Sequence, residues 1–112
     1  MKIIDKPISR GELQKIAKAK FGNLVKAVVD IEKKIMVIDA ELHADEEAAL
    51  LEKGSKQEHL WGINLYPELE GPDWIEFDSM INVRPSSGNR SRGVDDPSVR
   101  KKIVEVVNAL IP

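Results

Sequence analysis

The sequence contains no cysteine, and this absence excludes several kinds of chemistry at once. Without thiols the chain can form no disulfide framework, no thiolate zinc site and no cysteine nucleophile, so a reducing cytoplasm is the compartment we expect. No window approaches the ~18 consecutive apolar residues of a membrane helix, and the charged residues 1–7 do not resemble a secretion signal. We therefore expect a soluble, cytoplasmic protein with no membrane partner.

A basic surplus is also missing, because the net charge is −2 and the sequence pI is about 5.7. Proteins that coat nucleic acids usually have a domain pI above about 9, so the composition argues against general nucleic-acid binding. The length of 112 residues and the hydrophobic content of 42% fit one modest core. We predict a single globular domain over residues 1–112, without internal repeats.

Capping residues predict three helices. Ser9 and Glu12 form a capping box before the first helix. Asp45 is the expected N-cap of the second helix, whose acidic first turn suits the helix dipole. Asp96 followed by Pro97 starts the third helix, which places its apolar residues on one stripe.

Between the helices, two pairs of segments have the composition of strands. Residues 24–30 and 35–38 are rich in Val and Ile and predict a hairpin, although the absence of Asn-Gly or Asp-Gly leaves one helix through residues 26–36 as an alternative. Residues 60–66 and 74–84 alternate between apolar and polar and predict a second hairpin. The predicted fold is α+β in the order α-β-β-α-β-β-α, with a mostly antiparallel four-stranded sheet and helices packed on one face.

The most informative segment is residues 84–93, which we call the arginine loop. It gathers three of the five arginines of the chain, together with serine, asparagine and glycine, and contains no acid. Small residues allow backbone amides to turn toward one point, and guanidinium groups hold phosphate or carboxylate in a bidentate manner. The predicted anion-binding residues are Arg84, Ser86, Ser87, Gly88, Asn89, Arg90 and Arg92.

The arginine loop matches no established phosphate-binding motif. It lacks the Gly-Lys-Ser/Thr of a P-loop and the Gly-x-Gly-x-x-Gly of a dinucleotide fingerprint. The alternative is a solvated, mobile loop whose arginines pair with nearby Asp95 or Asp96, or with the acids of the second helix. Its predicted partner is an anionic small molecule or a nucleotide.

A second cluster lies at the start of the second predicted helix, where His43, Asp45 and Glu46 are the catalytic candidates. A histidine oriented by a carboxylate can act as a general base. Beside the arginines, it would suit hydrolysis or transfer of a phosphoester. The competing interpretation is that the acids only cap the helix and pair with its dipole. We predict no metal site and no cofactor.

A third cluster lies on the polar face of the second predicted hairpin. If its strands pair, polar side chains project to one side and meet across the strands. They would line a site beside the arginine loop, but a solvent-exposed face of an antiparallel sheet gives the same pattern. These residues are Asn64, Glu76, Asp78, Asn82 and Arg84.

Three segments carry a resemblance to a known family: Glu-Leu-His-Ala-Asp-Glu-Glu at 41–47, Leu-Trp-Gly-Ile-Asn-Leu-Tyr-Pro-Glu at 60–68, and Ile-Asn-Val-Arg-Pro-Ser-Ser-Gly-Asn-Arg-Ser-Arg-Gly at 81–93. The chain resembles, over nearly its whole length, a family of small prokaryotic proteins of unknown function. The resemblance implies a stand-alone, cytoplasmic domain and supplies no catalytic residues.

The sequence leaves three functions open. The first is a binding module whose arginine loop holds an anion, and the second is a phosphoester-processing enzyme that uses the His43 cluster. The third is a protein-interaction module or a homo-oligomer, in which the loop meets an acidic partner or the acidic patch of a second copy. Self-association of that kind would be sensitive to salt.

Overall fold

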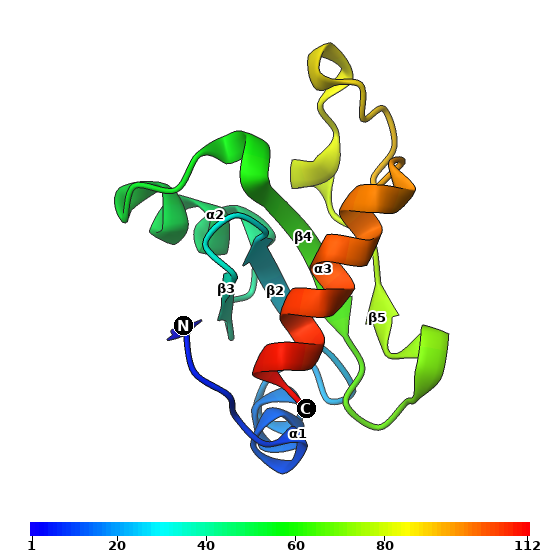
Figure 1. Cartoon of the computed structure of the whole chain (residues 1–112). Coiled ribbons are helices and arrows are strands. Elements are labelled where there is room, and N and C mark those ends of the chain that lie inside the picture. Colours follow the sequence, from blue (N-terminus) through cyan, green and yellow to red (C-terminus); the bar gives the residue numbers. More distant parts are fainter.

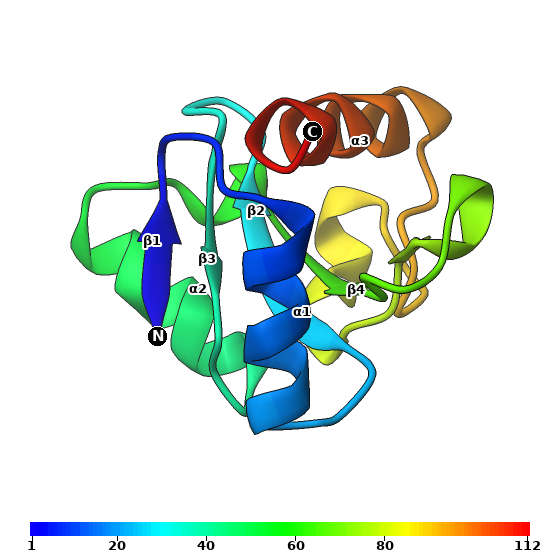
Figure 2. The ribbon, with the colours of Figure 1, turned by 90° about the horizontal axis from the view of Figure 1, so that it is seen from below.

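Five antiparallel strands form one sheet, in the order β1-β3-β2-β4-β5, and helices cover both of its faces (Figures 1 and 2). The computed structural model describes all 112 residues. No helix in it is both long and apolar enough to cross a membrane. The strands are β1 (Lys2–Ile4), β2 (Val25–Asp30), β3 (Ile35–Ile38), β4 (Leu60–Leu65) and β5 (Ile75–Glu76); the α-helices are α1 (Arg10–Ala19), α2 (His43–Glu52) and α3 (Pro97–Leu110); and four 3-10 turns are η1 (Gln57–His59), η2 (Gly71–Asp73), η3 (Met80–Asn82) and η4 (Pro85–Ser87).

The predicted α+β class and the first hairpin are confirmed. β2 and β3 pair from Ala27 opposite Ile38 to Asp30 opposite Ile35, so no helix runs through this region. The turn needs no Asn-Gly, because one carboxylate oxygen of Asp30 accepts the backbone N–H groups of Glu32 and Lys33. Side-chain bonds of this kind replace the missing turn signal.

The predicted strand count of four is wrong, because β1 adds a fifth strand at the edge beside β3. It has only three residues, which is too short for a periodic signal in the sequence. The caps of α1 and α3 are confirmed, since Ser9 accepts the N–H of Glu12 at 3.0 Å and Asp96 accepts that of Ser98 at 2.8 Å. Asp45 is not the cap of α2, because that helix begins at His43 and places Asp45 in its first turn.

The main core lies between the sheet and the pair α1 and α3. Leu13 of α1 and Ile103 of α3 are fully buried there against strand residues of one face. Figure 1 shows α3 crossing in front of the sheet while α1 lies at its lower end. The central strand residues of this core are Ala27, Val29, Met36, Ile38, Ile63 and Leu65.

The prediction that helices pack on one face only is wrong, because α2 covers the opposite face (Figure 2). Val28 and Val37 alternate with the residues of the main core and therefore point to the other side of the sheet. There they pack with Leu50 of α2 and with Leu60 in a second, smaller cluster. The central strands are apolar on both faces, and burying both requires a layer on each side.

The predicted strand over residues 74–84 is mostly wrong, because it stops after Glu76. The chain then crosses close to β4, where a side chain added at Gly62 would lie 2.5 Å from Ser79. Ser79 also accepts the N–H of Ile81 and so starts η3. The carboxamide of Asn82 then takes the place of a strand, since it accepts from Gly62 N at 2.8 Å and donates to Gly62 O at 2.9 Å.

Candidate functional site

Asn89 holds the arginine loop in one conformation. Its side-chain amide donates to the carbonyls of Asn82, Ser91 and Gly93, and its oxygen accepts the N–H of Asp95 at 2.8 Å. The residue is buried, with 4% of its surface exposed. The loop is therefore built around Asn89, whose polar atoms face the protein instead of a ligand.

Arg84 also belongs to the framework of the loop. Its guanidinium donates to the carbonyls of Ile81, Gln57 and Leu60, and it stacks on the ring of Trp61 at 4.5 Å. Burial lowers the pKa of Arg84, while Glu47 opposes this effect. Three of its N–H groups are thus used inside the protein, and the structure does not direct them toward the loop tip.

Asp95, just beyond the end of the arginine loop, binds two donors of the loop. Asp95 accepts the backbone N–H of Arg90 at 2.9 Å and the hydroxyl of Ser91 at 2.6 Å. These bonds lower the pKa of Asp95, the Ser91 hydroxyl being the largest cause. The backbone N–H of Arg90 and the hydroxyl of Ser91 are therefore already paired with a carboxylate of the protein.

Three side chains of the loop remain free of protein partners. Ser86 and Ser87 are exposed on η4 and make no side-chain hydrogen bond, and Gly88 follows them in the left-handed conformation with φ of 86°. Arg90 is exposed as well, and its guanidinium takes part in no hydrogen bond or ion pair. Arg92, in contrast, pairs with Asp78 at 2.6 Å in an exposed ion pair.

The predicted polar face exists, in modified form, at the end of the sheet face that α2 covers. Lys26 of β2, Asn64 of β4 and Glu76 of β5 lie opposite one another in register. Asn64 donates to Glu76 at 2.8 Å, and Tyr66 donates to the same carboxylate oxygen at 3.0 Å. We use the name polar shelf for Lys26, His43, Asn64, Tyr66, Glu76, Asp78 and Arg92.

His43 is the member of the polar shelf that α2 contributes. Its Nε2 lies 2.8 Å from the carbonyl oxygen of Ile63, which only accepts hydrogen bonds, so Nε2 carries a proton. The pKa of His43 is lowered, mainly by burial and also by Lys26, while the bond to Ile63, the charge of Asp78 and Asn64 raise it. A neutral ring with a proton on Nε2 leaves Nδ1 as an acceptor.

The structure does not bring the three catalytic candidates together. Asp45 is exposed and lines a hollow beside Met1, whereas Glu46 is fully buried and accepts the N–H of Ala40 at 3.2 Å. Burial raises the pKa of Glu46 to about 9, which keeps its carboxyl protonated at neutral pH. No three His, Asp or Glu side chains converge closely enough to hold a metal ion.

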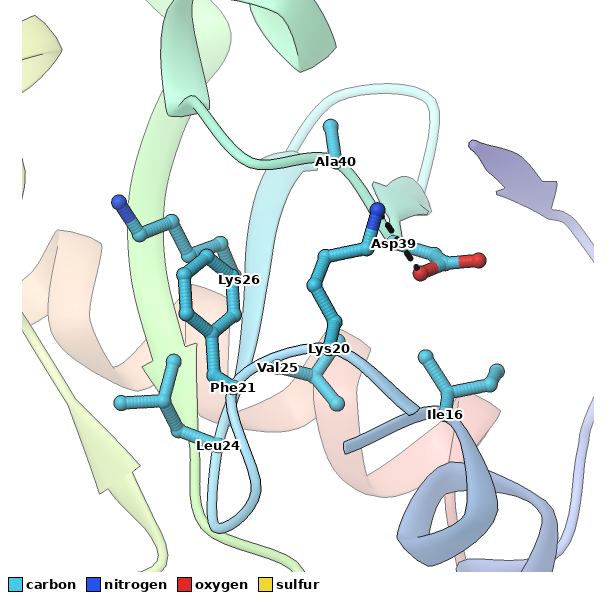
Figure 3. Close-up of a pocket in the computed structure, with 8 residues that line it drawn as sticks. All are labelled: Ile16, Lys20, Phe21, Leu24, Val25, Lys26, Asp39 and Ala40. Carbon is cyan, nitrogen blue, oxygen red and sulfur yellow. Dashed lines mark ion pairs between the residues drawn. The ribbon is translucent and has the colours of Figure 1, made fainter. Parts of the chain in front are cut away.

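The residue that sequence reasoning missed is Lys26. It belongs to the β2 hairpin, and only the pairing of β2 with β4 places it beside Asn64. Figure 3 shows its ammonium pointing away from the ion pair of Lys20 with Asp39. The ammonium lies 5.3 Å from the centroid of the Phe21 ring. The alternation along β2 could have shown that Lys26 lies on the polar face of its strand. The sequence could not show that β2 pairs with β4 in the register that places Lys26 opposite Asn64.

Fold and site together define a small α+β domain with a rigid arginine loop and a polar shelf on an antiparallel sheet. The chain belongs to the family described as a protein of unknown function, DUF5674, which matches residues 2–110. This match confirms the predicted membership of a family of unknown function over nearly the whole chain. Comparison with curated proteins and with solved structures gives no match.

Proposed function

We propose that the domain is a binding module for a small anion and that Arg90 is its principal ligand. The observation that carries the proposal is the free guanidinium of Arg90, on a loop whose backbone is held by the hydrogen bonds of Asn89 and Asp95. A guanidinium presents paired donors that match a phosphate or carboxylate. The exposed hydroxyls of Ser86 and Ser87 on the same loop can add hydrogen bonds.

The internal hydrogen bonds of the loop make binding through Arg90, Ser86 and Ser87 alone more favourable. A ligand that orders a mobile loop loses affinity to the conformational entropy of ordering. Here Asn89 and Asp95 already hold the backbone, so that cost is small. The ligand we expect has a phosphate or carboxylate at one end, as a nucleotide or a small organic acid does.

The test is the thermal stabilisation of the domain by inorganic phosphate. The Arg90→Ala variant should lose the stabilisation. Arg90→Lys should keep only part of it, because a lysine retains the positive charge but lacks the paired N–H donors of the guanidinium. Lys18→Ala, which removes an exposed cation from α1, serves as the matched control and should behave as the parent chain. If Arg90→Ala and the parent chain show equal stabilisation by phosphate, the loop is not an anion site.

The arrangement around His43 favours a second candidate, a phosphoester-processing enzyme centred on the polar shelf. His43 is held by Ile63 with Nδ1 free to accept a proton, and its neighbour Asp78 binds Arg92. In this version the negative charge near His43 comes from Asp78, in place of Asp45 and Glu46, which the sequence indicated. Turnover of p-nitrophenyl phosphate that disappears in His43→Gln would support it, and the absence of turnover in the parent chain would count against it.

A further inference from the structure

A groove of about 540 Å³ lies between α3 and the segment that leads from η2 into β5. Figure 1 shows α3 running beside β5, with the η2 turn next to them. Trp74 and Ile75 are buried in this region, and Phe77 and Val104 are half-buried. The volume lies within the ~300–1,000 Å³ that small-molecule sites occupy.

The rim of this groove carries positive charge and no acid. Arg100 and Lys101 line it from α3. Arg100 is fixed because its guanidinium donates to the carbonyls of Val94 and Asp95, while Lys101 is exposed and forms no ion pair. An apolar floor with a basic rim fits a ligand that has an apolar body and one negative group.

The aromatic floor is held in place before any ligand arrives. Arg10 stacks over the ring of Trp74 at 3.7 Å, and the same guanidinium donates to the carbonyls of Pro67 and Leu69. Trp74 is therefore fixed between α1 and the groove. Because Trp74 is only 4% exposed, it backs the groove, and the half-buried Phe77 and Val104 supply most of the apolar surface that a ligand can reach.

A second hollow, of about 740 Å³, lies along the same helix but differs in charge. Lys34 and Lys102 line it together with Glu32 and Glu105, so its charges balance. It lacks the aromatic floor. Of the two, only the groove at Lys101 has a net positive lining that favours an anion. Lys102, which lines the other hollow, serves as a neighbouring control.

We propose that this groove binds a small organic anion whose aromatic or aliphatic body packs on Trp74, Phe77 and Val104, with its acidic group at Lys101 and Arg100. This site is separate from the one at Arg90 and does not depend on it. The ligand class is an aromatic carboxylate or sulfonate of low molecular mass. Phosphate alone has no apolar body and gains nothing from the floor.

The experiment is a fluorescence titration of the folded, full chain with the aromatic sulfonate 8-anilinonaphthalene-1-sulfonate. Lys101→Glu should weaken binding by about tenfold, because the loss of one contact with a charged group typically raises Kd by about that factor. Lys102→Glu, with the same change in net charge one residue further along α3, should alter the affinity less than about twofold.

Two further variants test the floor and the location. Val104→Phe fills the groove with an apolar side chain and should weaken binding of the dye while the thermal transition stays cooperative. Lys18→Ala should leave dye binding unchanged, because Lys18 lies on α1 and does not line this groove. Equal weakening by Lys101→Glu and Lys102→Glu, or weakening by Lys18→Ala as strong as that by Lys101→Glu, would overturn the proposal.

Discussion

The two faces of the sheet are covered in different ways. The face that α1 and α3 cover is closed mainly by apolar side chains, among them Leu13 and Ile103. The face below α2 has a small apolar cluster around Leu50, and its remaining contacts come from polar groups such as His43, Glu46 and Asn82. One sheet thus uses non-directional burial on one side and directional hydrogen bonds on the other.

Because of this difference, the two faces should differ in how strongly their contribution to folding stability depends on pH. Burial of apolar surface depends little on pH, whereas a group whose pKa differs between the folded and the unfolded chain links folding to protonation. The α2 side contains the buried carboxyl with a raised pKa and the imidazole with a lowered pKa. We therefore expect the α2 layer to respond to pH first, and the substitutions below test the two faces against each other.

The largest effect is expected on the apolar face. Ile103→Ala in α3 removes a fully buried side chain and should lower the free energy of unfolding by about 2–5 kcal/mol. The loss should be the same at pH 6 and pH 8, because no titratable group lines the core there. Chemical denaturation at the two pH values measures it, and a loss that depends on pH would break the contrast between the faces.

Asn82→Ala tests the polar face and should cost somewhat less, about 3 kcal/mol. The change leaves the buried N–H and C=O of Gly62 without partners, and each unsatisfied group costs about 1–3 kcal/mol. The same denaturation experiment reports it. Asn82→Asp is the informative control, because it keeps an acceptor for Gly62 N but loses the donor for Gly62 O. An alanine variant as stable as the parent chain would show that water replaces the carboxamide.

Glu46→Gln should stabilise the domain increasingly as the pH rises. The pKa of Glu46 is about 9 in the folded chain and about 4.5 without the fold, so the folded chain keeps a proton that the unfolded chain releases. The stability associated with this proton is complete below pH 4.5 and is lost as the pH rises toward 9. The gap between variant and parent should grow by up to about 3 kcal/mol between pH 6 and pH 8.

Melting curves of both chains across that pH range test the Glu46 prediction. Glu52→Gln, at the exposed end of the same helix, is the control and should show a constant difference from the parent chain. Parallel curves for Glu46→Gln and the parent would mean that Glu46 is ionised in the folded state. The polar face would then resemble the apolar face in its pH response.

His43→Gln should produce the smallest effect and one of opposite direction in pH. The folded pKa of His43 lies below 6.5, so its contribution to stability is present above that value and is lost as the pH falls through the folded pKa. Glutamine can still donate to Ile63 O but does not titrate. Between pH 7 and pH 5 the parent should therefore lose more stability than the variant, which urea titrations at the two values can resolve.

The apolar side of the fold was predictable because local patterns determine it. The caps at Ser9 and Asp96 and the apolar runs of β2 and β4 were readable one segment at a time. The end of the strand after Glu76 was not, because it depends on Ser79 meeting Gly62 across the sheet. Apolar alternation continued along residues 77–83 and predicted a strand that the tertiary contact prevents.

The candidate site shows the same limit. The composition of the arginine loop indicated an anion site, but three of its members have other partners: Arg84 on backbone carbonyls, Asn89 inside the loop and Arg92 on Asp78. A residue type indicates which bonds a side chain can make, and only the fold decides which bonds it does make. Likewise, His43 and Asp45 are two residues apart in sequence yet lie in different surroundings.

The side chain of Asn82 binds the edge of β4 where a neighbouring strand could otherwise pair, and this affects how the protein avoids aggregation. Beyond its pairing with β5, the outer edge of β4 would expose backbone donors and acceptors to any passing chain. Asn82 and Arg84 occupy those groups at Gly62 and Leu60, and they cannot extend a sheet as a strand would. At the opposite edge, β1 is only three residues long. Both ends of the sheet are therefore poor templates for intermolecular pairing, and a variant that loses Asn82 should become prone to fibril formation as well as less stable.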